Sequence, residues 1–106
     1  MTEIVINKCH GGFSISKECV EHMARHGNQE TKKMLDRNES DYFYLCDTPR
    51  HDKILVNAVK ELGSKANGEY SRLEIVEIDG SIYKIDEYDG MEWVVEPKDI
   101  NWTKVK

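Results

Sequence analysis

The spacing of the apolar residues changes once along the chain, and this change limits the folds that the sequence can form. Residues 53–62 place apolar side chains every three or four positions, which is the spacing of one helix face. Residues 73–78 instead set Leu and Ile against acidic residues with a period near two, which is typical of a strand. Helices followed by a run of strands indicate an α+β fold and argue against a doubly wound parallel sheet.

Two Asp-Gly pairs divide the second half of the chain. Asp79-Gly80 and Asp89-Gly90 are turn sequences of the kind that connect antiparallel strands. They predict three consecutive strands that form an antiparallel β-meander, at residues 73–78, 81–87 and 91–96.

The first half of the chain predicts one strand and two or three helices. A β-branched run at residues 3–7 indicates a buried strand, and Ser16 and Asp52 are typical helix N-caps. The fold class that we expect is therefore α+β, with an N-terminal strand and two or three helices packed on a C-terminal antiparallel β-meander. The expected helices span residues 17–26, 28–37 and 53–62, residues 42–45 form a strand or an extended segment on the core, and residues 101–105 add an edge strand with Trp102 packed inward.

Length and charge exclude several classes of protein. A chain of 106 residues suits a single domain, residues 1–106. Its net charge of −5 argues against long nucleic acid or an anionic membrane as the main partner. The sequence shows neither a membrane span nor a signal peptide, and its three cysteines cannot all pair within one chain. We therefore expect a cytoplasmic protein with free thiols.

The glycine turn after the first strand is a candidate anion site. Lys8 is followed by Gly11, Gly12 and Phe13, directly before a helix start. Backbone N–H groups in such a loop, a helix N-terminus and a lysine are the ingredients of a phosphate site, and the Phe13 ring offers a surface for a base. The alternative is a tight turn that uses glycine for its backbone angles.

A second candidate lies at the start of the helix predicted at residues 53–62. Arg50 offers a planar fork for phosphate or carboxylate, and His51 is a potential general acid or hydrogen-bond donor. The alternative is a rigid proline turn with surface charges. The hairpin at residues 87–93 combines acids with Tyr88, which indicates either acid–base chemistry or a solvated strand edge.

Cysteine and histidine residues on the first helix raise the question of a metal site. Cys19, His22 and His26 fall within roughly 60° of arc on a 3.6-residue helix, so they can face one cation. Zinc modules are marked by two closely spaced ligands on each side of a turn. The chain does not show this arrangement: besides the three residues on the helix, the nearby candidates are Cys9 and His10, which are adjacent in the sequence. We therefore predict no metal site and no cofactor, with Cys19 at the edge of the core and both histidines at its solvent border.

Five segments, in this order, carry a resemblance along nearly the whole chain: I-N-K-C-H-G-G-F-S-I-S (6–16), D-T-P-R-H-D-K-I-L-V (47–56), E-L-G-S-K-A-N-G (61–68), L-E-I-V-E-I (73–78) and E-Y-D-G-M-E-W-V (87–94). With these segments the chain resembles a widespread group of small proteins from tailed bacteriophages and prophages, for which no activity is established. The resemblance implies that the glycine turn, the Pro-Arg helix start and the Tyr-Asp-Gly hairpin converge on one site, and that histidine is not fixed at positions 22 and 26. Residues 97–106 depart from the family pattern.

Three functions follow as hypotheses. The first is a phage accessory protein, active in counter-defence in the host cytoplasm, that binds and sequesters a small anionic nucleotide-like ligand without catalysis. The second is an inhibitor that binds a host protein, and the third is a small phosphoesterase or transferase that uses His51 or Cys9. Edge strands of two copies can pair with each other, so a homo-oligomer is also possible. The predicted ligand-binding residues are Lys8, Gly11, Gly12, Phe13, Arg50, His51 and Tyr88.

Overall fold

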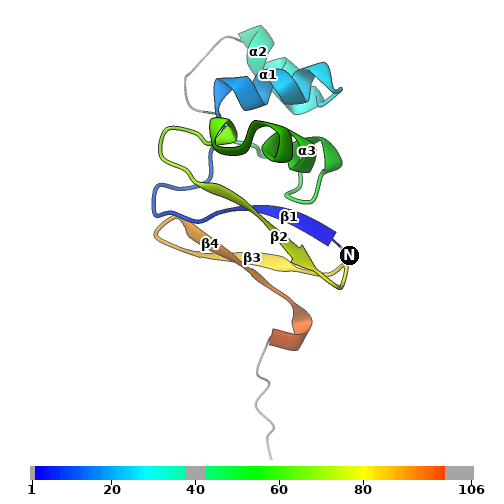
Figure 1. Cartoon of the computed structure of the whole chain (residues 1–106), viewed down its shortest axis with the longest axis vertical. Coiled ribbons are helices and arrows are strands. Elements are labelled where there is room, and N and C mark those ends of the chain that lie inside the picture. Colours follow the sequence, from blue (N-terminus) through cyan, green and yellow to red (C-terminus); the bar gives the residue numbers. More distant parts are fainter. Residues whose placement is uncertain (1, 38–42, 100–106) are drawn as a thin grey trace, which may run out of the picture.

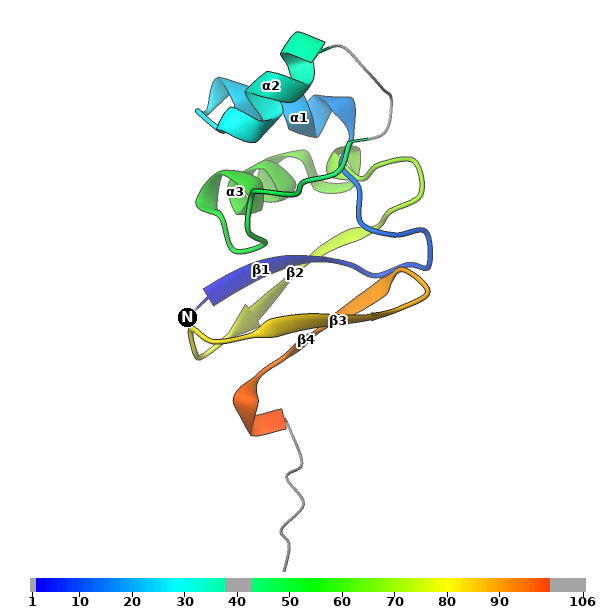
Figure 2. The same cartoon turned by 180° about the vertical axis from the view of Figure 1, so that it is seen from behind.

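A computed structural model describes residues 2–37 and 43–99 and shows an α+β fold with the two β-layers on one side of the helices. The helices cover one face of the β1–β2 sheet and the β3–β4 hairpin covers the other, as both views show (Figure 1, Figure 2). The elements are β1 (Thr2–Asn7), α1 (Lys17–Arg25), α2 (Gln29–Arg37), α3 (Lys53–Leu62), the 3-10 helix η1 (Gly63–Ala66), β2 (Leu73–Ile78), β3 (Lys84–Tyr88), β4 (Met91–Val95) and the 3-10 helix η2 (Pro97–Asp99).

Strand β1 is the central strand of the molecule because side chains from both of its faces are buried. Val5 belongs to the core beneath the helices, whereas Ile4 and Ile6 pack with Ile78 against the β3–β4 hairpin. A strand with both faces covered has an uninterrupted apolar sequence instead of an alternating one, which explains the run Ile4 to Ile6. Antiparallel pairing with β2 runs from Thr2 opposite Ile78 to Asn7 opposite Leu73.

The helices lie where their capping residues predict, and α1 and α2 differ from the expected bounds by one residue each. The Ser16 hydroxyl accepts the N–H of Cys19 at 3.1 Å, and the Asp52 carboxylate accepts the N–H of Leu55 at 3.1 Å. Helix α3 then ends at Gly63, whose φ of 58° lies in the left-handed region that favours glycine. The buried face of α3 consists of Leu55, Val56, Ala58 and Val59.

The C-terminal strands confirm the α+β class but pair differently from a continuous meander. Strands β3 and β4 form a hairpin through Asp89-Gly90, where both residues have positive φ. Strand β2 pairs with β1 and not with β3. Strands β2 and β3 do not pair because residues 79–83, which connect them, form a longer connection than a two-residue hairpin turn. This connection lets the chain leave the plane of the β1–β2 sheet.

Two sequence predictions concern segments at the margins of the structure. Phe43 is extended and buried, and it bridges Ile15 in antiparallel fashion, as expected for a segment on the core. Tyr42 and the edge strand predicted at residues 101–105 lie outside the described residues.

Within residues 2–37 and 43–99, no helix is long and apolar enough to cross a membrane.

Helix α2 is tied to the segment before α3 by one carboxylate. Glu30, in the first turn of α2, accepts the backbone N–H groups of Cys46, Asp47 and Thr48 at 2.6, 2.9 and 2.9 Å. Partial burial raises the pKa of Glu30, but these hydrogen bonds outweigh burial and hold its pKa below the usual 4.5. The ionised carboxylate is therefore the form that holds this loop.

We expect Glu30→Gln to lower the free energy of unfolding by about 1–2 kcal/mol at about pH 7, since hydrogen bonds to a charged acceptor are weakened. Because the folded pKa is depressed, this contribution is complete above pH 4.5 and is lost as the pH falls through the folded pKa. Urea unfolding of both proteins as a function of pH should show the difference shrinking in acid.

The matched control is Glu18→Gln, because Glu18 occupies the first turn of α1 and is exposed. This change alters the same kind of interaction with a helix dipole but removes no hydrogen bond to a loop. It should lower the free energy of unfolding by no more than about 0.5 kcal/mol. Equal losses in the two variants would contradict a specific role for Glu30.

Candidate functional site

The ion pair between Arg50 and Glu92 lies where β1, the start of α3 and β4 meet. Two parallel hydrogen bonds join the side chains, Nη1 to Oε1 at 2.6 Å and Nη2 to Oε2 at 2.9 Å. Glu92 Oε1 also accepts the backbone N–H of Asn7 at 2.8 Å, and the Arg50 carbonyl accepts the N–H of Val5 at 2.9 Å. The side chain of Glu92 is 8% exposed, so this carboxylate is satisfied inside the protein.

The glycine turn and the β3–β4 turn meet beside this ion pair. The Arg50 guanidinium carbon lies 3.5 Å from the centre of the Phe13 ring, which is a cation–π contact. A Cβ atom built on Gly90 would lie 2.6 Å from both the backbone nitrogen of Gly12 and the carbonyl oxygen of His10. Glycine at position 90 therefore permits a close approach of the two turns as well as its own φ of 91°.

The side chain of Asn7 joins the same two turns from the end of β1. Its Nδ2 donates to the carbonyl oxygens of Cys9 and Gly90 at 2.7 and 2.8 Å, and its Oδ1 accepts the N–H of Arg72 at 2.8 Å. Asn7 is completely buried. Nothing in the residues around Asn7 marked it beforehand, because Cys9 is its one neighbour in the sequence among these three partners, whereas Gly90 and Arg72 come near it only in the fold.

The structure brings some of the predicted ligand-binding residues together and leaves others apart. Phe13 and Arg50 are in contact, and Gly12 lies against the turn that follows Tyr88. These groups are used within the protein, because Arg50 is paired with Glu92 and Phe13 is only 8% exposed. The remaining predicted residues differ in exposure: Tyr88 is 74% exposed, Lys8 is half-buried, and Gly11 packs against the backbone of Tyr70.

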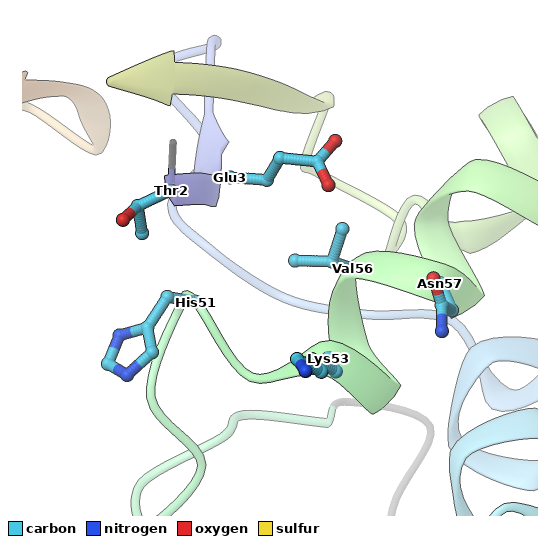
Figure 3. Close-up of a pocket in the computed structure, with 6 residues that line it drawn as sticks. All are labelled: Thr2, Glu3, His51, Lys53, Val56 and Asn57. Atoms are coloured by element: carbon cyan, nitrogen blue, oxygen red, sulfur yellow. The ribbon is translucent and has the colours of Figure 1, made fainter. Parts of the chain in front are cut away.

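His51 belongs to a separate pocket of about 390 Å³ between β1 and the start of α3 (Figure 3). His51 and Lys53 border it on the helix side, and Glu3 borders it on the strand side. The Glu3 carboxylate is paired with the Lys60 ammonium at 2.7 Å. Among Glu3, Lys60 and Lys53, it is therefore Lys53 whose charge is not compensated by the other two. The lining residues are Thr2, Glu3, His51, Lys53, Val56 and Asn57.

The two side chains of the enzyme hypothesis both have partners within the protein. His51 Nδ1 lies 2.7 Å from the hydroxyl oxygen of Tyr83, and partial burial raises the pKa of Tyr83 above its usual 10.0. The Cys9 thiol donates to the carbonyl oxygen of Tyr70 at 3.0 Å. His51 and Cys9 are thus each held by a different partner, and neither contact joins the two side chains to each other.

The outward face of the β3–β4 hairpin is a candidate surface that includes Tyr88 and overlaps the hairpin noted in the sequence at residues 87–93. The register pairs Asp86 with Trp93 and Tyr88 with Met91 on the face opposite to the Ile85 and Val94 pair, which is partly buried against the β1–β2 sheet. Trp93 is 42% exposed and Tyr88 is 74% exposed. We call this surface, formed by Lys84, Asp86, Tyr88, Met91, Trp93 and Val95, the outer hairpin face.

Comparisons with family models, with curated proteins and with solved structures found no match to this chain. The resemblance to bacteriophage proteins therefore stays a prediction. The physical properties of the described residues carry the functional proposals that follow.

We expect Arg50→Met and Glu92→Gln each to cost about 3 kcal/mol of unfolding free energy, because each variant leaves a largely buried charge or donor without its partner. The double variant should cost less than the sum of the two by about 1–3 kcal/mol, which is the range for directly contacting groups. Urea unfolding of the four proteins in this cycle measures the coupling.

The control is Asp86→Asn, which breaks an exposed ion pair with Lys84 at 3.6 Å. It should change the unfolding free energy by no more than about 1 kcal/mol. Additive losses for Arg50 and Glu92 would contradict a coupled pair and would return Arg50 to the set of groups available to a ligand.

Proposed function

We propose that this chain is a non-catalytic binding protein whose outer hairpin face docks on a basic surface of another protein. The observation that carries this proposal is the exposed pair of aromatic side chains, Trp93 and Tyr88, on a strand pair whose opposite face is buried. Aromatic residues are enriched at protein interfaces and supply much of their binding energy.

The distribution of charge supports a basic partner. Residues 79–96 contain six acidic residues and one lysine, and their net charge of −5 equals that of the whole chain. The rest of the chain is therefore balanced. Glu92 is buried and paired with Arg50, and Asp86 on the outer hairpin face is paired with Lys84, so the other four acidic residues, which flank this face, supply the negative charge that a partner would meet. A partner with a basic surface would be attracted to this hairpin, which raises the rate of association and selects against acidic partners.

The hairpin is also held firmly enough to present a binding surface. Its inner face packs Ile85 and Val94 against the β1–β2 sheet, and Glu92 is fixed by Arg50 and Asn7. A surface on rigid strands loses little conformational entropy on binding. In the setting that the family resemblance implies, the partner is a host protein in the bacterial cytoplasm and the binding serves counter-defence.

We expect Trp93→Ala and Asp86→Lys each to abolish retention of a partner that the unaltered chain captures from a bacterial lysate, because they remove an apolar anchor and reverse a neighbouring charge. Mass spectrometry of the retained proteins, followed by titration with the purified partner, provides the measurement. Retention should also weaken with salt, since exposed charges are screened over about 10 Å at 0.1 M ionic strength.

Glu21→Lys is the matched control, because it makes the same charge change on the exposed side of α1. It should leave the retained protein unchanged. Identical sets of retained proteins for all variants, with each variant folded by circular dichroism, would refute the outer hairpin face as the docking surface.

A second candidate function is binding of a small nucleotide-like anion, and the pocket beside His51 is the observation that favours it. Lys53 offers an ammonium group and Asn57 a side-chain amide to a phosphate in a space of about 390 Å³. This site includes one of the predicted ligand residues, His51. It differs from the site predicted between the glycine turn and Arg50, where Arg50 is paired with Glu92 and the Phe13 ring is in contact with Arg50.

For this second function we expect a nucleoside monophosphate to bind the unaltered chain and Lys53→Gln to weaken that binding about tenfold, the equivalent of one charged hydrogen bond. Lys65→Gln, an exposed lysine in η1, should leave the affinity unchanged. Calorimetry with a panel of linear and cyclic nucleotides is the measurement, and an absence of heat with a folded protein would rule this function out.

A further inference from the structure

We propose that His22, His26 and Glu61 form a binding site for a divalent transition metal ion of the zinc class, on the side of the molecule formed by α1 and α3. Each residue offers one ligand atom, and the three atoms lie within 4.8 Å of one another. Two imidazole nitrogens and one carboxylate oxygen are a donor set that Zn²⁺ accepts, with the remaining position left for water.

The two histidines are one helical turn apart, and their rings are already close. His22 lies in the last turn of α1 and His26 is its C-cap residue. The ring centres are 4.4 Å apart with an angle of 30° between the planes. Side chains four residues apart share a helix face, so the backbone of α1 holds both imidazoles toward the same point.

Glu61 comes from a different helix and completes the set. Its Oε2 lies 2.5 Å from His22 Nε2, although the two residues are 39 positions apart in the sequence. Glu61 is next to the last residue of α3, and the C-terminal ends of both helices carry partial negative charge, which favours a cation between them.

His22 is the buried member of the site. Its side chain is 7% exposed, whereas Glu61, the partner of its Nε2, is 65% exposed. An ion in place of the proton between Nε2 and Oε2 would therefore be bound by one ligand that packing fixes and by two ligands at the surface. The Nδ1 atom of His22 is buried without a hydrogen-bond partner and takes no part in the site.

The site can adjust to an ion because two of its three ligands are at the surface. Tetrahedral zinc with bonds of about 2.0–2.1 Å sets ligand atoms roughly 3.3 Å apart. The His22–Glu61 contact must therefore open and the wider separations must close. His26 and Glu61 are exposed and can rotate, whereas His22 is fixed by packing.

Cys19 is not part of this site, although its spacing from His22 had grouped the two. It is fully buried in the core and its Sγ lies 3.9 Å from the sulfur of Met23. Burial raises the pKa of Cys19 to about 12, so it is a neutral thiol and not a thiolate ligand.

The test is thermal unfolding of the full chain with and without Zn²⁺, together with calorimetric titration of Zn²⁺. Zinc should raise the melting temperature of the unaltered chain, since an ion that binds the folded state stabilises it by mass action. His26→Asn and Glu61→Gln should each reduce the affinity by at least about tenfold, because loss of even an outer-shell partner costs 10–100-fold. Both residues are exposed, so these variants preserve the core that His22→Asn would disturb.

Two matched variants, His10→Asn and Glu21→Gln, should keep the full response to zinc. In an NMR titration that observes the imidazole nitrogens, His22 and His26 should shift while His10 and His51 do not. An absence of any zinc response would overturn the proposal. So would a response that persists in His26→Asn and disappears on alkylation of the thiols or in His10→Asn, since that would place the ion at Cys9 and His10.

Discussion

The ion pair between Arg50 and Glu92 is the interaction on which the arrangement of the layers depends. Burying a carboxylate is unfavourable unless a cation and hydrogen-bond donors meet it. Here the donors come from the start of α3 and from β1, whereas the carboxylate comes from β4. Once Glu92 is buried, the hairpin has one permitted position, because any shift of β4 along the sheet would separate the two charges. Apolar contacts alone would tolerate several such positions.

The local elements could be predicted from the sequence because their causes are local. The cap at Asp52, the stop at Gly63 and the turn at Asp89-Gly90 each depend on residues within a few positions, and the structure confirms them. The partners of those elements could not be predicted in the same way. Neither strand spacing nor turn chemistry indicates that β2 pairs with β1, or that Glu61 lies beside His22, since both contacts join residues far apart in the sequence, Thr2 with Ile78 in the first case and residues 39 positions apart in the second. Side-chain pattern gives the type of an element, whereas the packing of all layers together selects its neighbours.

The predicted binding residues illustrate the same difference. Glycine, arginine and an aromatic ring near helix starts are typical of anion sites, but these residue types also build compact junctions between layers. Phe13, Arg50 and Gly90 serve as such a junction. Exposed groups that can meet other molecules lie elsewhere in the described part of the chain: Trp93 and Tyr88 on the outer hairpin face, Lys53 beside the His51 pocket, and His26 and Glu61 near the ends of α1 and α3.

The burial of β1 on both faces also determines the order in which the molecule can be assembled. Its hydrogen-bonding partner and the hairpin that covers its other face come from the last third of the described chain, and the contact from Asn7 to Glu92 spans 85 positions. During synthesis, β1 must therefore wait in an open state while the helices form. Closing such long loops is slow, so we expect folding to be limited by the docking of the C-terminal strands and not by helix formation. Until then, a β-branched strand with two apolar faces is exposed, and this is the period in which the chain most needs protection from aggregation.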